Sequence, residues 1–285
     1  MKHARIASIA VLLPALWIGS AAAQALLPGE RETTIAAIPG VVAAGGRWEI
    51  VWADFETADG IVGTSDGGVM FAQEQTDTIR KLAPDGREYT VLGPTRGVGS
   101  VSLDAQGRLY AVERTCTEPL NTFLPGCNDL TAVVQLLPER NVLAMSFANG
   151  APLGRLNDLI ADGKGGAYFT VGGAYYVSPA GVVSTVADQD IRSNGIMLSP
   201  DGRTLYVTNN TSVLAFDVRG DSTCTPRLPV TYSRPSESTA IPSPPSMGAV
   251  GPDGKAWATP EGIRNTAMTI YRLPMLSRGY MGRPK

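Results

Sequence analysis

Short runs in which apolar and polar residues alternate recur along the chain, and most of them follow a turn built from Asp and Gly. The first copy runs from Asp66 to Phe71, and the five turns start at Asp66, Asp104, Asp162, Asp201 and Asp253. Asp-Gly turns supply the positive φ angles that hairpins need, and the β-branched and aromatic residues that follow favour strands. The pattern predicts an all-β fold.

The spacing of the copies indicates how the strands are grouped. Two of the four intervals are about 40 residues long, which leaves room for about four strands and is the period of a β-propeller blade. A single sandwich of many strands is the alternative. The period is too long for simple hairpins and too regular for a Greek key, so we prefer the propeller.

Two segments depart from this period. The interval after Asp104 contains Cys116 and Cys127, natural disulfide partners in an exported protein, and Cys224 would then remain a free structural thiol. The run from Arg219 to Met247 is rich in proline and polar residues and is typical of irregular loop. One blade is therefore expected to be incomplete.

Polar residues or glycines stand at the start of the strands that precede these turns. They include Asp59, Gly99, Asn157 and Asn194. Because equivalent positions of successive blades face the same channel, we expect Asp59, Asn157 and Asn194 to lie close together. Oxygen donors without His or Cys suit a hard cation such as Ca²⁺, and the alternative is that each polar side chain only caps its own turn.

The N-terminus has the pattern of a secretory signal peptide. Basic residues precede an apolar run from Ile6 to Ile18, and small residues lead to Ala23. We expect cleavage near Ala23, so that residues 1–23 are removed and residues 24–285 form one propeller domain in the periplasm or outside the cell.

Composition then excludes several kinds of chemistry and partner. The only histidine is His3, inside the predicted signal peptide, so histidine-dependent catalysis and histidine metal sites are not expected in the mature protein. The 24 Lys and Arg residues against 26 Asp and Glu form no basic block, which argues against a nucleic-acid partner. Outside the signal, no stretch approaches the ~18 apolar residues of a membrane span. A monomer without a membrane partner is expected.

The chain resembles the senescence marker protein / gluconolactonase / luciferin-regenerating enzyme family from about Thr34 to its C-terminus. The most specific stretches are Arg155-Leu156-Asn157-Asp158-Leu159 and Ser193-Asn194-Gly195-Ile196, and Thr269-Ile270-Tyr271-Arg272 looks like a family last blade. The resemblance implies a six-bladed β-propeller with a divalent cation in its channel, Ca²⁺ before Zn²⁺, Mn²⁺ or Fe²⁺. It also implies a small lactone or ester as substrate.

The resemblance assigns roles to single residues. Asn194 matches the family's metal-binding Asn, Asn157 the channel Asn that touches substrate, and Arg155 the Arg two residues before it. Asp59 stands where relatives usually have the Glu of a Glu-Gly-Pro phrase, and this shorter carboxylate can still bind a cation. Asn209 is the fourth expected ligand.

Two departures bear on activity and on closure of the propeller. Asn209 stands where the family's catalytic Asp follows the Leu-Tyr-Val strand, and an amide cannot take up a proton. Ser246 lies near the position of another family Asp, inside the compressed run. The N-terminal strand around Trp48 to Trp52 is expected to close the last blade.

Together these residues predict an exported lactonase. The cation would polarise the lactone carbonyl while Arg155 holds substrate hydroxyls or the developing oxyanion. Asp158 or Glu113 is the candidate base, with hydroxide on the cation as a third option, and Glu113 is also a candidate substrate contact. As alternatives, Arg155 would form a structural ion pair, Glu113 and Arg114 a local pair at the cysteine loop, and Glu74 a residue of the rim.

A non-catalytic exported propeller that binds a small ligand or a protein is the competing function. Asn209 and the short blade favour it, whereas the retained Arg155, Asn157 and Asn194 favour the enzyme. A Ser-type hydrolase is excluded because the expected mature chain has no histidine to activate a serine.

Overall fold

The computed structural model describes residues 36–46, 49–54, 56, 58–114, 131–187, 190–199, 201–210, 212–226, 230–231, 268–273 and 276. All of these belong to one compact unit, Thr33–Lys285. The predicted signal peptide, Cys116, Cys127, Ser246 and the last Asp-Gly copy lie outside the described residues. Within the described part, no helix is long and apolar enough to cross a membrane.

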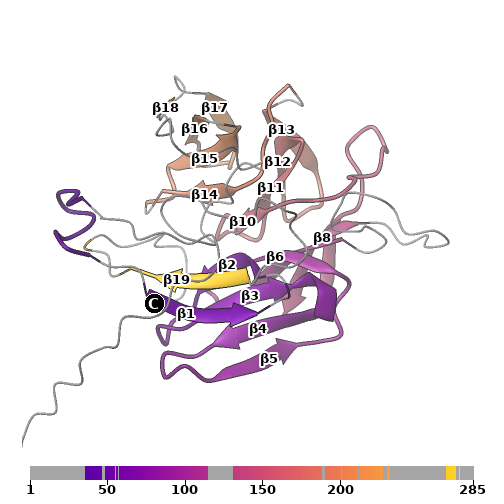
Figure 1. Ribbon diagram of the computed structural model, residues 1–285. Coiled ribbons are helices and arrows are strands. Elements are labelled where there is room, and N and C mark those ends of the chain that lie inside the picture. Colours follow the sequence, from indigo (N-terminus) through magenta and orange to yellow (C-terminus); the bar gives the residue numbers. More distant parts are fainter. Residues whose placement is uncertain are drawn as a thin grey trace, which may run out of the picture. The chain divides into compact units, whose positions relative to one another are not determined.

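Four antiparallel sheets make up most of the described structure (Figure 1). The first contains β2 (Asp59–Gly63), β3 (Val69–Gln73), β4 (Thr78–Leu82) and β5 (Glu88–Leu92). The second contains β6 (Val98–Leu103), β7 (Leu109–Glu113), β8 (Ala132–Leu137) and β9 (Asn141–Ala144). The third contains β10 (Leu159–Ala161), β11 (Ala167–Val171), β12 (Gly173–Val177) and β13 (Val183–Ala187).

The fourth sheet begins with β14 (Ile196–Leu198), β15 (Thr204–Asn209) and β16 (Ser212–Val218). Both β17 (Cys224–Pro226) and β18 (Val230–Thr231) then pair with β16. Apart from β18, the strands of these four sheets pair in chain order, which is the meander of a propeller blade. The single helical element among the described residues is the 3-10 turn η1 (Glu74–Thr76) between β3 and β4.

The Asp turns predicted from the sequence are present in four described copies. In each of them the Asp Oδ1 accepts the N–H of the residue two positions later. The pairs are Asp66–Gly68 (3.3 Å), Asp104–Gln106 (3.0 Å), Asp162–Lys164 (2.7 Å) and Asp201–Arg203 (3.0 Å). The carboxylate therefore holds each hairpin closed at the entry to β3, β7, β11 and β15.

An apolar cluster joins each sheet to the next one. The clusters are Val62 and Ile79 with Val101 and Leu109, Tyr110 and Val112 with Phe169 and Tyr175, and Ile160 and Tyr168 with Ile196 and Leu205. Strands covered on both faces read as continuous apolar runs. Accordingly β6, β7 and β12 are buried along their whole length, whereas no residue of the outer strands β5 and β13 is buried.

A further antiparallel pair joins the two ends of the unit. β1 (Glu49–Asp54) pairs with β19 (Met268–Arg272), and Trp52 and Ile270 pack on the first sheet, where the Trp52 and Phe71 rings lie 4.8 Å apart. This is the pairing that the sequence predicted for the N-terminal strand. The β-propeller class is confirmed, whereas the number of six blades remains a prediction.

The beginning of the proline-rich run differs from its sequence interpretation. β17 and β18 lie inside the run from Arg219 to Met247, so this part is not irregular but completes the fourth sheet. Cys224 lies on β17, is free, and has its pKa raised to about 11 by burial. The raised pKa supports its interpretation as a structural thiol.

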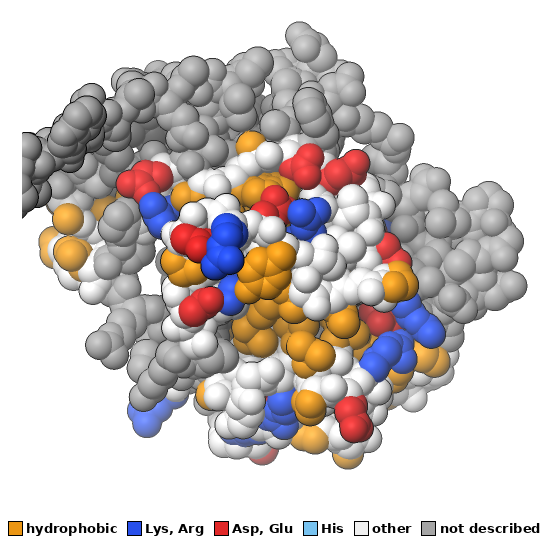
Figure 2. Space-filling model, turned by 90° about the horizontal axis from the view of Figure 1, so that it is seen from below, with side chains coloured by type: hydrophobic (Ala, Val, Ile, Leu, Met, Phe, Trp, Pro, Cys, Tyr) orange, Lys and Arg blue, Asp and Glu red, His pale blue; other side chains and the backbone are white. Residues whose placement is uncertain are grey.

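Charges of both signs lie close together on one face of the molecule (Figure 2). On the face shown in Figure 2, blue Lys and Arg groups lie beside red Asp and Glu groups, with hydrophobic side chains between them. Ion pairs among the described residues include Lys81–Asp66 (2.6 Å) and Arg80–Glu88 (2.7 Å).

Candidate functional site

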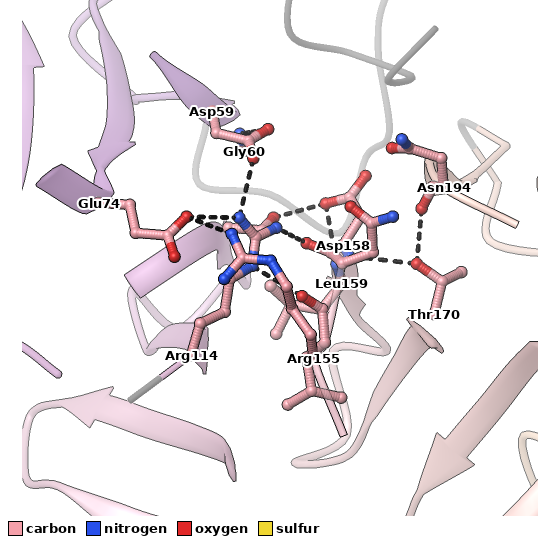
Figure 3. A network of polar contacts seen from close by, with 12 residues as sticks. Asp59, Gly60, Glu74, Arg114, Arg155, Asp158, Leu159, Thr170 and Asn194 are labelled. Carbon is pink, nitrogen blue, oxygen red and sulfur yellow. Dashed lines mark hydrogen bonds and ion pairs between the residues drawn. The ribbon is translucent and has the colours of Figure 1, made fainter. Parts of the chain in front are cut away.

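The polar positions singled out in the sequence lie around the starts of the first strands of successive sheets. These first strands contact one another in the order β2, β6, β10 and β14. Figure 3 shows the side chains of Asp59, Asp158 and Asn194, which come from three different sheets, in one cluster. The structure thus brings together residues that lie far apart in the sequence.

Gly60 sets the approach of β2 to β6. Its φ is +52°, and a Cβ atom at this position would lie 2.2 Å from the Cα of Ser100. Glycine is therefore required both by the backbone conformation and by the available space. The N–H of Gly60 donates to Asp59 Oδ1 at 2.9 Å, which orients this carboxylate at the start of β2.

Asp158 connects three sheets through its carboxylate. The Ser100 hydroxyl of β6 donates to Asp158 Oδ1 at 2.5 Å, and the Leu159 N–H donates to the same oxygen at 2.8 Å. The Ile196 N–H, at the start of β14, donates to Oδ2 at 3.2 Å. Burial raises the pKa of Asp158 to about 7; the negative charge of Asp59 adds to this shift, and the bond from Ser100 opposes it.

Two threonines at the ends of strands fix the backbone beside this carboxylate. Thr170 donates its hydroxyl to Asn194 O at 2.5 Å, and its carbonyl accepts the Asn157 N–H at 2.8 Å. The Thr208 hydroxyl accepts the Asn194 N–H at 3.1 Å. Both asparagines are partly exposed.

Two arginines and two carboxylates complete the cluster (Figure 3). Glu74 Oε2 accepts hydrogen bonds from Arg155 at 2.8 Å and from Arg114 at 2.9 Å. The same Nη1 of Arg114 lies 3.2 Å from Asp59 Oδ2. Burial alone would lower the pKa of Arg114, but the charges of Asp59 and Glu74 outweigh it and raise that pKa.

Two other candidates have local partners of their own. Both oxygens of Glu113 are bound by Arg140, at 3.1 and 2.6 Å. Glu113 and Arg114 therefore do not form the local pair considered in the sequence analysis, since each contacts a different partner. The Oδ1 of Asn209, at the end of β15, accepts the Arg192 N–H at 2.9 Å.

The donor set of the cluster fits a hard divalent cation in its chemistry. Asp59, Asn157 and Asn194 offer carboxylate and amide oxygens, the ligands that such ions prefer. Within the described ranges, no group of three His, Cys, Asp or Glu side chains could hold a metal ion by itself. Amide oxygens would have to complete the coordination.

Four residues of this cluster, Glu74, Ser100, Arg114 and Thr170, were not predicted from the sequence as site residues. The repeat pattern singled out Gly99 but not the adjacent Ser100, and it did not single out Thr170. Glu74 was interpreted as a rim residue and Arg114 as a partner of Glu113. For Arg114 the available signal was its place directly after Glu113, the last residue of β7. Consecutive strand residues point to opposite faces, which argues against a pair between Glu113 and Arg114.

Comparison with known proteins adds the following findings. The family model "SMP-30/Gluconolactonase/LRE-like region" matches residues 91–269, more than half of the chain. The lactonase drp35 of Staphylococcus aureus is 42% identical over 67 residues, which cover 20% of this chain and 21% of the lactonase. The chain thus matches about a fifth of the length of these curated relatives.

Solved structures show the same fold at low identity. The gluconolactonase XC5397 of Xanthomonas campestris is 20% identical, with a TM-score of 0.50 over 64% of this chain and 65% of that chain. Another structure described as a gluconolactonase is 16% identical, with a TM-score of 0.51 over 66% of this chain and 69% of that chain. At these identities the likeness concerns the fold.

Proposed function

The chain belongs to the SMP-30/gluconolactonase/LRE-like family, and from this premise we propose that it is a lactonase that opens a sugar-type lactone or a related ester with a divalent cation, foremost Ca²⁺. The observation that carries the proposal is the position of Asp158. Its carboxylate joins β6 to β14 through Ser100 and Ile196, beside Asp59 and Asn194. A carboxylate held in this way is suited to acid-base chemistry on a small substrate.

The cation would be held by Asp59, Asn157 and Asn194. When bound there, it would polarise the lactone carbonyl. Asn209 stays a further candidate ligand, since an amide oxygen that accepts the N–H of Arg192 has a second lone pair. Glu113 is left out of substrate binding, since Arg140 binds both of its oxygens.

Residues of the chain supply the proton transfers and the hydrogen bonds of the reaction. Water adds to the carbonyl carbon, and Asp158 accepts the proton that the water loses. Arg155, fixed by Glu74, donates hydrogen bonds to substrate hydroxyls or to the oxyanion of the tetrahedral intermediate. The ring C–O bond then breaks, Asp158 returns its proton to the ring oxygen, which becomes a hydroxyl group, and the new carboxylic acid of the opened chain loses its proton to water.

Acid release from an aldonolactone, followed in a pH-stat, tests this function. We expect turnover above the spontaneous rate, loss of turnover with EDTA, and recovery with Ca²⁺. Arg155→Lys should raise KM. Arg108→Lys should leave KM unchanged; Arg108 pairs with the buried Asp104 at 2.6 Å. Binding of sugar lactones without any acid release would contradict the enzyme and support the non-catalytic propeller.

The proposal includes export. Residues 1–23 have the pattern of a cleaved signal. Mass spectrometry of the protein from a periplasmic or culture fraction should give a chain that starts near residue 24. A full-length chain confined to the cytoplasm would contradict this part of the proposal.

A further inference from the structure

Arg114 is the most constrained charged side chain of the cluster. Its side chain is 4% exposed, and its guanidinium has partners in three directions. Nε donates to Leu156 O at 2.7 Å, Nη2 donates to Asn157 O, and Nη1 reaches both Asp59 and Glu74. Only the planar fork of arginine can satisfy acceptors in so many directions at once.

These partners belong to the two halves of the proposed site. Asp59 is a proposed cation ligand, and Leu156 O and Asn157 O lie in the segment that places Asn157 and Asp158. Glu74 shares one oxygen, Oε2, between Arg114 and Arg155. Arg114 therefore links the carboxylate at the start of β2 to the arginine that would hold the substrate.

Gly99 provides the space for this guanidinium. A Cβ atom at position 99 would lie 1.9 Å from the Cζ of Arg114 and 2.0 Å from its Nε. Unlike Gly60, Gly99 is not in the left-handed region of φ, so its backbone does not require glycine. The requirement comes from the side chain of Arg114.

Stability alone does not account for the burial of Arg114. Transfer of a guanidinium from water into the interior carries a large desolvation penalty, and a buried ion pair is often no more stabilising than apolar residues of the same volume. Its bonds to backbone carbonyls of a functional segment, and to two carboxylates of the site, point instead to precise placement of these groups.

We propose that Arg114 is a positioning residue that holds Asp59 for the cation and, through Glu74, holds Arg155 for the substrate. This inference rests on the proposed function. The two contacts of Arg114 have separate effects. The contact with Glu74 acts on substrate binding, whereas the contact with Asp59 acts on cation binding.

Two variants distinguish these two effects. For each variant, the Ca²⁺ affinity is measured by isothermal titration calorimetry, and KM and kcat are measured with an aldonolactone. Arg114→Lys keeps the charge but loses the fork, and should weaken both Ca²⁺ binding and substrate binding, each by about 10- to 100-fold, as loss of a residue that orients site groups does. Glu74→Gln should raise KM while the Ca²⁺ affinity stays within about 3-fold of wild type.

Arg108→Lys is the matched control. Its arginine also pairs with a buried carboxylate, that of Asp104, and this variant should leave both affinities unchanged. Melting temperatures of all variants without Ca²⁺ show whether they fold. The split between the two affinities is a readout that a merely structural role would not produce.

The outcomes distinguish this inference from the proposed function. A wild-type chain that binds Ca²⁺ and opens lactones, with Arg114→Lys unchanged in both affinities, overturns the positioning role alone. Equal losses of Ca²⁺ affinity in Arg114→Lys and Glu74→Gln also overturn it, because the contacts of Arg114 with Glu74 and with Asp59 would then not have separate effects. A wild-type chain that neither binds Ca²⁺ nor opens lactones overturns the proposed function, and the positioning role with it.

Discussion

The Ser100 hydroxyl donates a hydrogen bond to the Asp158 carboxylate across 2.5 Å, although the two residues lie in different sheets and are 58 positions apart. This contact ties β6 to the segment before β10, where the proposed base and the proposed ligand Asn157 are adjacent. Because it crosses a boundary between sheets, it fixes the carboxylate relative to both.

Ser100→Ala tests what this contact contributes. The half-buried carboxylate would lose a donor, which costs about 1–3 kcal/mol of unfolding free energy. We expect kcat on an aldonolactone to fall about 10-fold, the lower end of the effect of removing a hydrogen-bond partner from a site residue.

Ser102→Ala is the matched control for this variant. Ser102 lies on the same strand, is equally buried, and accepts the Ala161 N–H at 3.1 Å. Urea unfolding should show a similar loss of stability, with kcat unchanged. An equal fall of kcat in both variants would show that Ser100 acts only through stability.

Asn194→Ala should abolish the stabilisation of the fold by Ca²⁺ and leave the fold intact. The backbone of Asn194 is bonded to Thr170 and Thr208, and truncation of the side chain leaves both bonds in place. Without metal, we expect a melting temperature within about 2–4 °C of wild type, which corresponds to ~1 kcal/mol.

Asn149→Ala is the control for the loss of an amide, since Asn149 caps an exposed turn through the Ala151 N–H at 3.0 Å. This variant should retain the full Ca²⁺-induced rise of the melting temperature. The same rise in Asn194→Ala would exclude Asn194 as a ligand.

Asp66 should make the stability depend on pH. Hydrogen bonds from Lys81 and Thr64 hold the pKa of this exposed carboxyl well below its usual value of 3.8. A carboxyl whose pKa is lowered by folding stabilises the protein above its unfolded pKa, and this contribution disappears as the pH falls through the folded pKa. The difference in unfolding free energy between wild type and Asp66→Asn should therefore be full at neutral pH and shrink below about pH 4.

Chemical denaturation between pH 3 and pH 7 measures this difference. Ser65→Ala changes an exposed neighbour in the same turn, and its difference from wild type should not vary with pH. A difference for Asp66→Asn that stays constant over the whole range would contradict the assigned ion pair with Lys81.

Gly99→Ala should reproduce the loss caused by Arg114→Lys without changing any charge. The added methyl group would collide with the guanidinium, and such overpacking costs about 1–3 kcal/mol. We expect the Ca²⁺ affinity and the substrate affinity to fall together.

Gly63→Ala is the corresponding control, because a Cβ atom on this residue of β2 would meet no atom within 4 Å. Denaturation should show it to be neutral or more stable by about 0.4–1 kcal/mol. If Gly99→Ala behaved like Gly63→Ala, the tight contact between Gly99 and Arg114 would be refuted.

Local chemistry made part of this structure predictable from the sequence. The turns at Asp66, Asp104, Asp162 and Asp201 are closed by atoms two residues apart, so the sequence alone specifies them. The repetition of these turns placed Asp59, Asn157 and Asn194 in equivalent positions; in the structure Arg114 contacts both Asp59 and Asn157, and Thr170 contacts the backbone of both Asn157 and Asn194.

Long-range pairing made the rest unpredictable. Arg114 meets Glu74 across 40 positions and Arg155 meets it across 81, and nothing in the local sequence selects these partners. Glu113 and Arg114 were read as a pair because they are adjacent, whereas a strand sends adjacent side chains to opposite faces. The strands β17 and β18 were missed because proline suggested a loop, although both lie at the outer side of the fourth sheet, where a missing N–H is tolerated.

The central claim is that oxygen ligands from separate sheets surround one divalent cation. An anomalous-difference map at long wavelength, from crystals of the protein grown with Ca²⁺, tests it most directly. The account predicts one strong peak about 2.3–2.6 Å from oxygens of Asp59 and Asn194. A protein that binds Ca²⁺ only elsewhere, with no peak between these two residues, would contradict it.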